Sequence, residues 1–258
     1  MDYVRPKKHL GQHFLRDESI ARRISDSLTG HGHYKTVLEI GPGTGVLSKY
    51  LMMNDNFQWW GMDIDTESIG YLRKNFPEFD SNILENDFLK TDLAELFANQ
   101  KIAVIGNFPY NISSQILFKI LENRQQVTEM VGMFQKEVAQ RVVAGPGGKV
   151  NGILSVLCQA FYDVEYLFQV NENVFSPPPK VKSAVIRFKR NNVGKLECDE
   201  KAFFMVVKMA FNQRRKTLRN ALKQLQIDWA KLPGELAGKR AEELDVNEFV
   251  SIVNALPS

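Results

Sequence analysis

Apolar and polar residues alternate in blocks along the first two thirds of the chain, and these blocks predict strands and helices in turn. Short apolar runs with the length of buried strands occur at residues 36–40, 58–64, 82–86 and 102–106. Apolar residues at helical spacing lie between or after such runs, as in residues 113–123. The alternation predicts an α/β fold with a mostly parallel sheet and helices on both faces.

The same pattern predicts three more strands and then a helical region. The strands are expected at residues 129–135, 164–170 and 183–190, with helices at residues 136–144 and 151–162. After a polar stretch at residues 191–194, residues 200–255 show only helical spacing. We therefore expect a seven-stranded, Rossmann-like domain at residues 1–190 and a small all-helical domain at residues 191–258.

Distinctive residues follow the first four predicted strands. They are, in chain order, Gly41, Gly43 and Gly45, then Asp63, then Asp87 with Phe88, and then Asn107. Open parallel sheets bind their ligands at the carboxyl ends of the strands. We therefore expect these residues to lie side by side around one site.

The glycine-rich turn and the two acids indicate a ligand with a ribose and an adenine. The dinucleotide pattern GxGxxG needs a glycine where this chain has Val46, so a carboxylate and an ammonium fit the turn better than a pyrophosphate. Asp63 follows Gly41 at about the 20-residue offset of acids that bind ribose hydroxyls. Asp87 offers an acceptor to an adenine amine. Alternatively, the turn only joins a strand to a helix and Asp63 caps the next helix.

The tetrapeptide Asn107-Phe108-Pro109-Tyr110 combines two hydrogen-bond acceptors with a flat ring. The Asn107 amide oxygen and the Phe108 carbonyl can accept, while Pro109 has no N–H that would compete. The exocyclic amine of adenine or cytosine fits, because it donates two hydrogen bonds while the base lies on Tyr110. Alternatively, the tetrapeptide is an ordinary turn.

Five segments together resemble the ribosomal RNA adenine dimethyltransferases of the KsgA type. They are residues 10–15 (LGQHFL), 39–45 (EIGPGTG), 86–87 (ND), 107–112 (NFPYNI) and 175–185 (FSPPPKVKSAV). The resemblance implies a class I methyltransferase that uses S-adenosylmethionine. It further implies dimethylation of N6 of two adjacent adenosines near the 3′ end of 16S rRNA, in the small ribosomal subunit or its precursor, and a role in ribosome biogenesis.

The resemblance also implies roles for individual residues. Those that would line the cofactor are Gly41, Asp63, Asp87, Asn107 and the backbone of His13 and Leu15. Phe175 would stack on the target adenine opposite Tyr110, or alternatively would be a core residue. The family more often has Asn at the position of His13 and Glu at the position of Asp63. Asp63 should still reach the ribose, whereas the resemblance assigns no contact to the His13 side chain.

A basic segment in the second domain predicts contact with RNA phosphates. Its residues are Lys208, Arg214, Arg215, Lys216, Arg219 and Lys223, and no acid lies among them. The net charge of the 258-residue chain is only +3, so the distribution of charge is more informative than its sum. Alternatively, this segment is a solvated helix face.

Other features narrow the class of protein. Cys158 and Cys198 form no CxxC motif, and no thiolate lies near the histidines, so we expect no metal site. The apolar runs are too short to cross a membrane, and we expect a cytoplasmic monomer. Two rival functions are a 23S rRNA adenine dimethyltransferase of the macrolide-resistance type and a non-catalytic ribosome assembly factor.

Overall fold

The computed structural model describes residues 4–257, which divide into two compact units. We call them the sheet unit, residues up to 139 and 165–190, and the helical unit, residues 140–164 and from 191 onward. The predicted domains, 1–190 and 191–258, share the later boundary with these units but place residues 140–164 differently.

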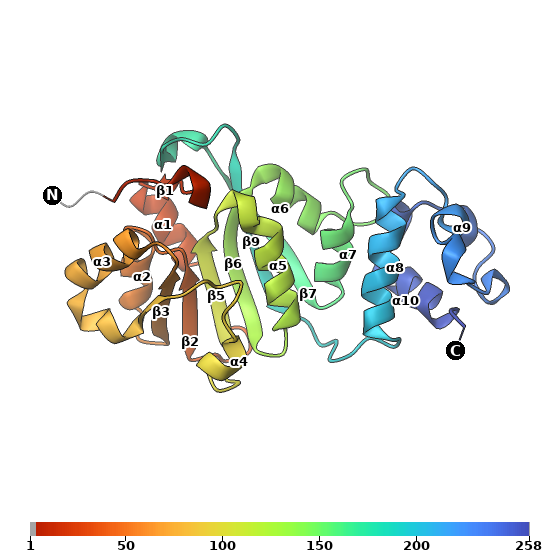
Figure 1. Cartoon of the computed structure of the whole chain (residues 1–258), viewed down its shortest axis with the longest axis horizontal. Helices are drawn as coiled ribbons and strands as arrows, with labels where there is room; N and C mark the ends of the chain where they lie inside the picture. The colour runs from red at the N-terminus through yellow and green to blue at the C-terminus, as the bar shows by residue number, and fades with distance from the viewer. Residues whose placement is uncertain (1–3, 258) are drawn as a thin grey trace. The chain divides into compact units, whose positions relative to one another are not determined.

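Seven strands form one sheet in the order β4, β3, β2, β5, β6, β9, β7 (Figure 1). Their bounds are β2 (Thr36–Ile40), β3 (Gln58–Asp63), β4 (Ile83–Glu85), β5 (Ile102–Asn107), β6 (Val127–Gln135), β7 (Tyr162–Val170) and β9 (Ser183–Arg190). Strands β4, β3, β2, β5 and β6 pair in parallel, and β9 is antiparallel to β6. The predicted fold class is confirmed, and the carboxyl ends of the first four predicted strands are neighbours.

A second sheet has two short strands, β1 (Phe14–Leu15) and β8 (Phe175–Ser176). They pair in antiparallel register, with Leu15 opposite Phe175. This pairing joins the arm at the start of the chain to the proline-rich segment that follows β7. Two parts of the predicted family motif are therefore adjacent in space.

The helices of the first part of the chain pack on a buried sheet. They are α1 (Glu18–Ser25), α2 (Ser48–Met52), α3 (Thr66–Asn75), α4 (Leu93–Leu96), α5 (Ser113–Glu122) and α6 (Lys136–Val143). Val37 and Ala103 share a core with Ile24 of α1. Leu38 and Val104, which alternate with them along the strands, are also fully buried, and Figure 1 shows α5 in front of the sheet beside β6.

Aspartates begin several of the helices. The side chains of Asp17, Asp65 and Asp92 accept hydrogen bonds from backbone N–H groups in the first turns of α1, α3 and α4. Asp199 and Asp245 do the same for two helices of the helical unit. Each carboxylate satisfies N–H groups that have no partner within the helix, which fixes where the helix begins.

The helical unit contains α7 (Ile153–Gln159), α8 (Glu200–Asn212), α9 (Leu218–Ala221) and α10 (Val246–Asn254). Its core includes Phe203, Phe211 and Phe249, with the Phe211 and Phe249 ring centroids 6.1 Å apart. Between α9 and α10 the chain forms only short 3₁₀ helices. Helical spacing predicted the class of this region correctly but not its broken course.

Candidate functional site

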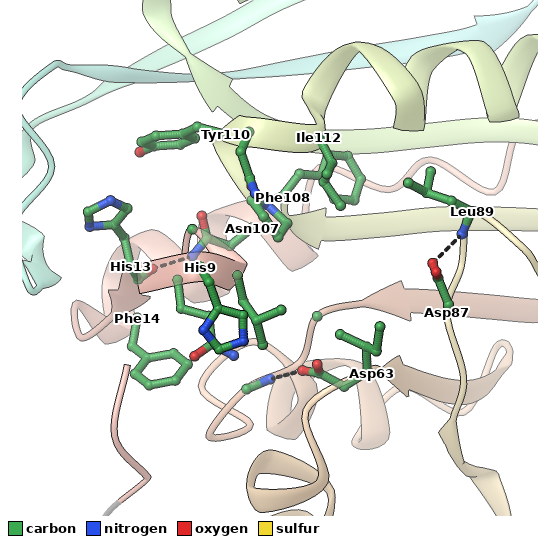
Figure 2. A pocket seen from close by; sticks show the side chains of 18 residues that line it. His9, His13, Phe14, Asp63, Asp87, Leu89, Asn107, Phe108, Tyr110 and Ile112 are labelled. Atoms are coloured by element: carbon green, nitrogen blue, oxygen red, sulfur yellow. Dashed lines mark hydrogen bonds between the residues drawn. The ribbon is translucent and has the colours of Figure 1, made fainter. Parts of the chain in front are cut away.

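A cavity of about 250 Å³ lies within the sheet unit (Figure 2). The predicted site residues that line it are His13, Gly41, Gly43, Asp63, Asp87, Asn107, Phe108, Pro109 and Tyr110. They come from the arm and from the carboxyl ends of β2, β3 and β5 and the loop after β4. The parallel register therefore brings together most of the residues that sequence reasoning selected.

Three predicted cofactor-binding residues do not line this cavity. Leu15 and Phe88 are 5% and 4% exposed and belong to the core. Gly45 faces the end of α3 instead, since a β-carbon there would lie 2.8 Å from the ring of Phe76, which follows that helix.

Phe175 also lies away from the cavity. It is 4% exposed and shares the apolar core with Leu15, which is opposite it in the β1–β8 pair. Its ring therefore fills the core, which was the alternative interpretation. Stacking of Phe175 on an adenine stays a prediction, and it would require the ring to leave this packing.

The glycine-rich turn opens onto the cavity. Gly41 and Gly43 have φ angles of 67° and 56°, a conformation that other residues rarely adopt. A β-carbon at Gly41 would meet nothing within 4 Å, and one at Gly43 would lie 2.9 Å from the Phe14 ring. Glycine at position 41 therefore leaves the backbone open to a ligand, whereas glycine at position 43 makes room for the Phe14 ring.

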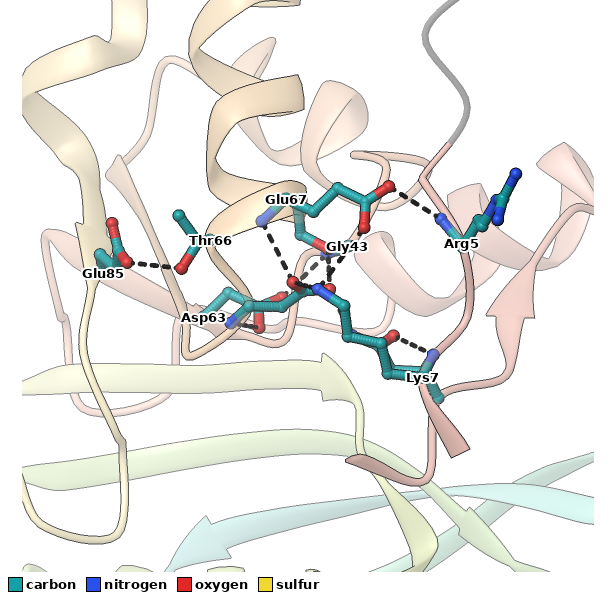
Figure 3. Close-up of polar contacts among 10 residues, drawn as sticks. Arg5, Lys7, Gly43, Asp63, Thr66, Glu67 and Glu85 are labelled. Carbon is teal, nitrogen blue, oxygen red and sulfur yellow. Dashed lines mark hydrogen bonds and ion pairs between the residues drawn. The ribbon is translucent and has the colours of Figure 1, made fainter. Parts of the chain in front are cut away.

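Asp63 is a buried carboxylate that also holds the turn. Its oxygens accept hydrogen bonds from Asp65 N at 2.9 Å and Gly43 N at 3.4 Å (Figure 3). Burial raises the pKa of the Asp63 carboxyl. The partly exposed Asp87 accepts from Leu89 N at 3.0 Å (Figure 2). Both acids face the cavity with acceptor oxygens, as the sequence predicts.

The Asn107 amide has a defined orientation. Its Nδ2 donates to the His13 carbonyl at 2.8 Å (Figure 2). A carbonyl oxygen can only accept, so the atom of the amide that faces it must be the nitrogen. The other end of the amide, Oδ1, is thereby left as an acceptor in a cavity that Asn107 lines.

The Phe108 ring anchors the tetrapeptide in the sheet. It is 1% exposed and packs edge-on against Phe134, with ring centroids 5.1 Å apart. Gly106 and Gly132 are opposite one another in β5 and β6, and a β-carbon at either would clash with the Phe108 ring. The paired glycines therefore make room for this ring, which fixes the position of the residues beside it.

Tyr110 and His13 form a pair of nearly parallel rings, with centroids 5.5 Å apart and planes at 26°. The Tyr110 hydroxyl is 2.5 Å from Ser183 Oγ. Burial raises the pKa of the Tyr110 hydroxyl. His13 Nδ1 donates to the Pro177 carbonyl at 2.8 Å. Sequence reasoning missed Ser183 and Pro177, although both lie within the motif at residues 175–185.

The predicted RNA-binding residues of the helical unit differ in their exposure to solvent. Those that are exposed are Lys208, Arg215, Lys216, Arg219 and Lys223. Arg214 is partly buried, with its guanidinium paired with Glu242 at 3.6 Å and donating to the Lys149 carbonyl. Gly147 N also donates to the Glu242 carbonyl, at 2.9 Å. Arg214 therefore ties down the loop at residues 145–149.

Among residues 4–257, no group of three or more His, Cys, Asp or Glu side chains could hold a metal ion. Within the same range, every helix is too short or too polar to span a lipid bilayer.

Comparisons with known proteins match nearly the whole chain. A sequence profile described as ribosomal RNA adenine dimethylase matches residues 4–257. A relative named ribosomal RNA small subunit methyltransferase A, from Cytophaga hutchinsonii, is 58% identical over 256 residues, covering 99% of each chain. The relative of that name from Flavobacterium johnsoniae is 54% identical over 256 residues, covering 99% of this chain and 97% of its own.

Solved structures show the same fold. A dimethyladenosine transferase from Plasmodium falciparum superposes with a TM-score of 0.76 at 26% identity, covering 93% of this chain and 96% of its own. A 23S rRNA methyltransferase has a TM-score of 0.72 at 23% identity, covering 94% of this chain and 99% of its own. The second likeness concerns the fold alone.

Proposed function

Because this chain belongs to the ribosomal RNA adenine dimethylase family, we propose that it dimethylates N6 of two adjacent adenosines near the 3′ end of 16S rRNA, with S-adenosylmethionine as methyl donor. It is a ribosomal RNA methyltransferase. Relatives at 50–58% identity bear the name of a small-subunit enzyme, which supports the choice of 16S rRNA. The 23% identity to a 23S enzyme gives no support to that rival.

The cavity suits S-adenosylmethionine. The open backbone at Gly41 would hold the amino-acid part, Asp63 the ribose hydroxyls and Asp87 the adenine amine. When bound, this cofactor supplies an electrophilic methyl group. A strand-to-helix turn alone accounts for the positive φ angles, but it does not require the cavity that Gly41 shares with Asp63 and Asp87.

Asn107 and Phe108 would act on the target amine. The amine of adenine is a poor nucleophile because its lone pair is delocalised into the ring. Hydrogen bonds from its two N–H groups to Asn107 Oδ1 and the Phe108 carbonyl would draw the nitrogen towards a pyramidal shape and free the lone pair for attack. The chain thus contributes orientation and electrostatic stabilisation, and the methylated nitrogen can then lose a proton to solvent.

Tyr110 and Pro109 would position the base. Tyr110 offers a ring face beside the acceptors, and its bond to Ser183 fixes the ring plane. Pro109 leaves the turn without a competing N–H. We also propose that the basic segment of the helical unit contacts RNA phosphates and that the protein acts as a monomer.

The observation that carries this proposal is the orientation of the Asn107 amide. The hydrogen bond from Nδ2 to the His13 carbonyl leaves Oδ1 as an acceptor in the same cavity as the predicted ribose ligand Asp63. An ordinary turn has no reason to present an acceptor there.

The proposal is tested with under-methylated ribosomal particles. Small and large subunits are incubated separately with the protein and labelled S-adenosylmethionine, and the modified bases are mapped. We expect label only in the small subunit, on N6 of two neighbouring adenosines. Label in the large subunit would favour the 23S enzyme, and binding without label would favour a non-catalytic assembly factor.

A further inference from the structure

The arm at the start of the chain touches the tetrapeptide at two points and the next residue, Asn111, at a third. The His13 carbonyl accepts from Asn107, and the His13 ring lies beside that of Tyr110. Gly11 approaches so closely that a β-carbon there would lie 2.5 Å from Asn111 Oδ1. The position of the arm therefore bears directly on the orientation of the Asn107 amide.

One buried carboxylate, Asp65, contacts two residues of the arm. Asp65 is 2% exposed and forms an ion pair with Lys7 (Figure 3), while its Oδ2 accepts from Gln12 Nε2 at 3.0 Å. Gln12 Oε1 in turn accepts from Lys7 N at 2.8 Å. Lys7 and Gln12 thus both bind Asp65 and also contact each other.

The charge of Asp65 is stabilised by these partners. Burial raises its pKa, but hydrogen bonds from Gln12 and Lys7 act in the other direction and leave the pKa below its ordinary value. The hydrogen bond to Asp65 raises the pKa of Lys7. Both groups are therefore charged at neutral pH, and the arm is attached by a charge-assisted contact.

Asp65 is also tied to the residue proposed to bind ribose. Asp65 N donates to Asp63 Oδ1 at 2.9 Å, and its side chain caps α3 through Glu67 N at 3.1 Å. The carboxylate thus stands on a fixed helix end, between the acid of the cavity and the arm. A rigid support of this kind is what precise placement of a reacting group requires.

We propose that Asp65 is a positioning residue, which docks the arm through Lys7 and Gln12 so that the His13 carbonyl turns Asn107 Oδ1 towards the target amine. The inference rests on the proposed function, because it assigns Asp65 an effect on that methyl transfer. Asp65 itself touches no reacting atom. The signals for this role in the sequence are weak, since an Asp before a helix is ordinarily a cap.

The test is a double-mutant cycle between Lys7→Gln and Asp65→Asn. Asn keeps an oxygen that can cap α3, and Gln keeps most of the length of the lysine. Each variant alone should lower the single-turnover rate roughly tenfold, within the 10²-fold that a misplaced reacting group costs. Affinity for particles should stay unchanged, because the basic segment lies in the helical unit. The double variant should be little slower than the slower single variant, because both break the Lys7–Asp65 pair, and only the lesser contacts of Lys7 with Glu67 at 3.5 Å and of Asp65 with Gln12 are separate.

Conservative and matched variants separate positioning from folding. Lys7→Arg keeps the charge and should restore most of the rate. Lys101→Gln removes the same charge from an exposed residue before β5 and should act like the unmodified protein. Rate losses that multiply in the double variant would overturn the proposal, as would a loss confined to binding affinity.

A second measurement does not depend on activity. Gly11 N donates to the Lys8 carbonyl at 3.0 Å within the docked arm. Exchange of the Gly11 amide with deuterium should therefore be faster in Lys7→Gln than in the unmodified protein. Unchanged exchange would contradict docking by Asp65. Absence of methylation by the unmodified protein would instead contradict the proposed function, whatever the exchange shows.

Discussion

The cavity brings together residues that are far apart in the sequence, whereas the basic segment disperses residues that are close together in it. His13 and Asn107 lie 94 positions apart and share a hydrogen bond, because the arm reaches the end of β5. The basic residues lie close together in the sequence, yet they are distributed over α8, α9 and the turns beside them. Arg214 among them pairs with Glu242 instead of remaining exposed like Arg215.

This difference shows which kinds of pattern predict a site. Residues at the ends of neighbouring parallel strands must meet, because the sheet register fixes where each strand ends. A run of like charges specifies only composition, and the tertiary structure decides which of its members face solvent. We therefore expect large, residue-specific effects in the cavity and small, additive ones in the basic segment.

The largest effect should come from Asn107→Ala. This change removes the oriented acceptor and should lower kcat by about 10²-fold or more, the scale of a lost preorganised hydrogen bond. Particle affinity should survive, because phosphate contacts lie elsewhere. Single-turnover methylation on saturating particles measures the rate, with Asn171→Ala, an exposed amide, as the control. A near-normal rate in Asn107→Ala would contradict a role for the tetrapeptide in catalysis and leave it as an ordinary turn.

The next effect concerns the stability of the fold and depends on a buried carboxyl group, that of Glu39 in β2. Glu39, at 2% exposed, accepts from Trp59 Nε1 at 2.8 Å, and burial raises its pKa from 4.5 to about 7. Between these pH values the folded protein retains a proton that the unfolded chain releases, so stability falls as pH rises. The shift corresponds to about 3 kcal/mol.

Glu39→Gln keeps an acceptor for Trp59 and removes this titration. The free energy of unfolding, measured in urea from pH 4 to 8, should lose its downward slope between pH 4.5 and 7. Above pH 7 the variant should be the more stable protein. The exposed Glu78→Gln serves as the control. An unaltered slope would mean that Glu39 titrates as an ordinary carboxyl.

A smaller effect is expected at Asp87. Asp87→Ala removes an acceptor from the adenine amine of the cofactor and should weaken its binding by roughly 1–3 kcal/mol. Asp87→Asn keeps one oxygen, which can still accept from Leu89 N or the amine, and should lose less. Calorimetry with S-adenosylmethionine ranks the two variants. If both variants bind S-adenosylmethionine as tightly as the unmodified protein does, Asp87 does not contact the cofactor.

The smallest effect should come from the basic segment. Arg215→Gln with Lys216→Gln should weaken particle binding a few-fold and reduce the salt slope by about 0.7–0.9 per lost phosphate contact. Arg214→Gln should instead lower thermal stability, because it releases Glu242 and the Lys149 carbonyl. If the two variants change particle binding and thermal stability in the same way, Arg214 does not differ in function from the exposed cations.

Local patterns were sufficient to predict most of the sheet. The strands at residues 36–40 and 183–190 have the predicted bounds, because a glycine turn or a polar stretch ends each apolar run. The strand predicted at residues 82–86 is shorter, Ile83–Glu85. Asn82 lies in a 3₁₀ helix and its side chain donates to the Trp59 carbonyl at 2.8 Å. No local rule predicts such a contact.

The site was predictable where it depends on strand ends and not where it depends on packing between distant segments. Asp63 and Asn107 follow from register. The burial of Phe175 follows from its pairing with Leu15, and the capture of Gln12 by Asp65 spans 53 positions. Both contacts involve the arm, whose sequence contains no periodicity that would place it.

The Phe108 ring and the paired glycines occupy a shared space, with consequences for redesigning the site. The ring fills the volume that β-carbons of Gly106 and Gly132 would take, so these three positions form one packing unit across β5 and β6. The two glycines are not equivalent, because a β-carbon at Gly106 would also lie 2.6 Å from the Ile40 backbone oxygen, whereas the nearest atoms to one at Gly132 belong to the Phe108 and Phe134 rings. Only position 132 can therefore exchange volume with residue 108, and any redesign of the tetrapeptide has to leave Gly106 in place.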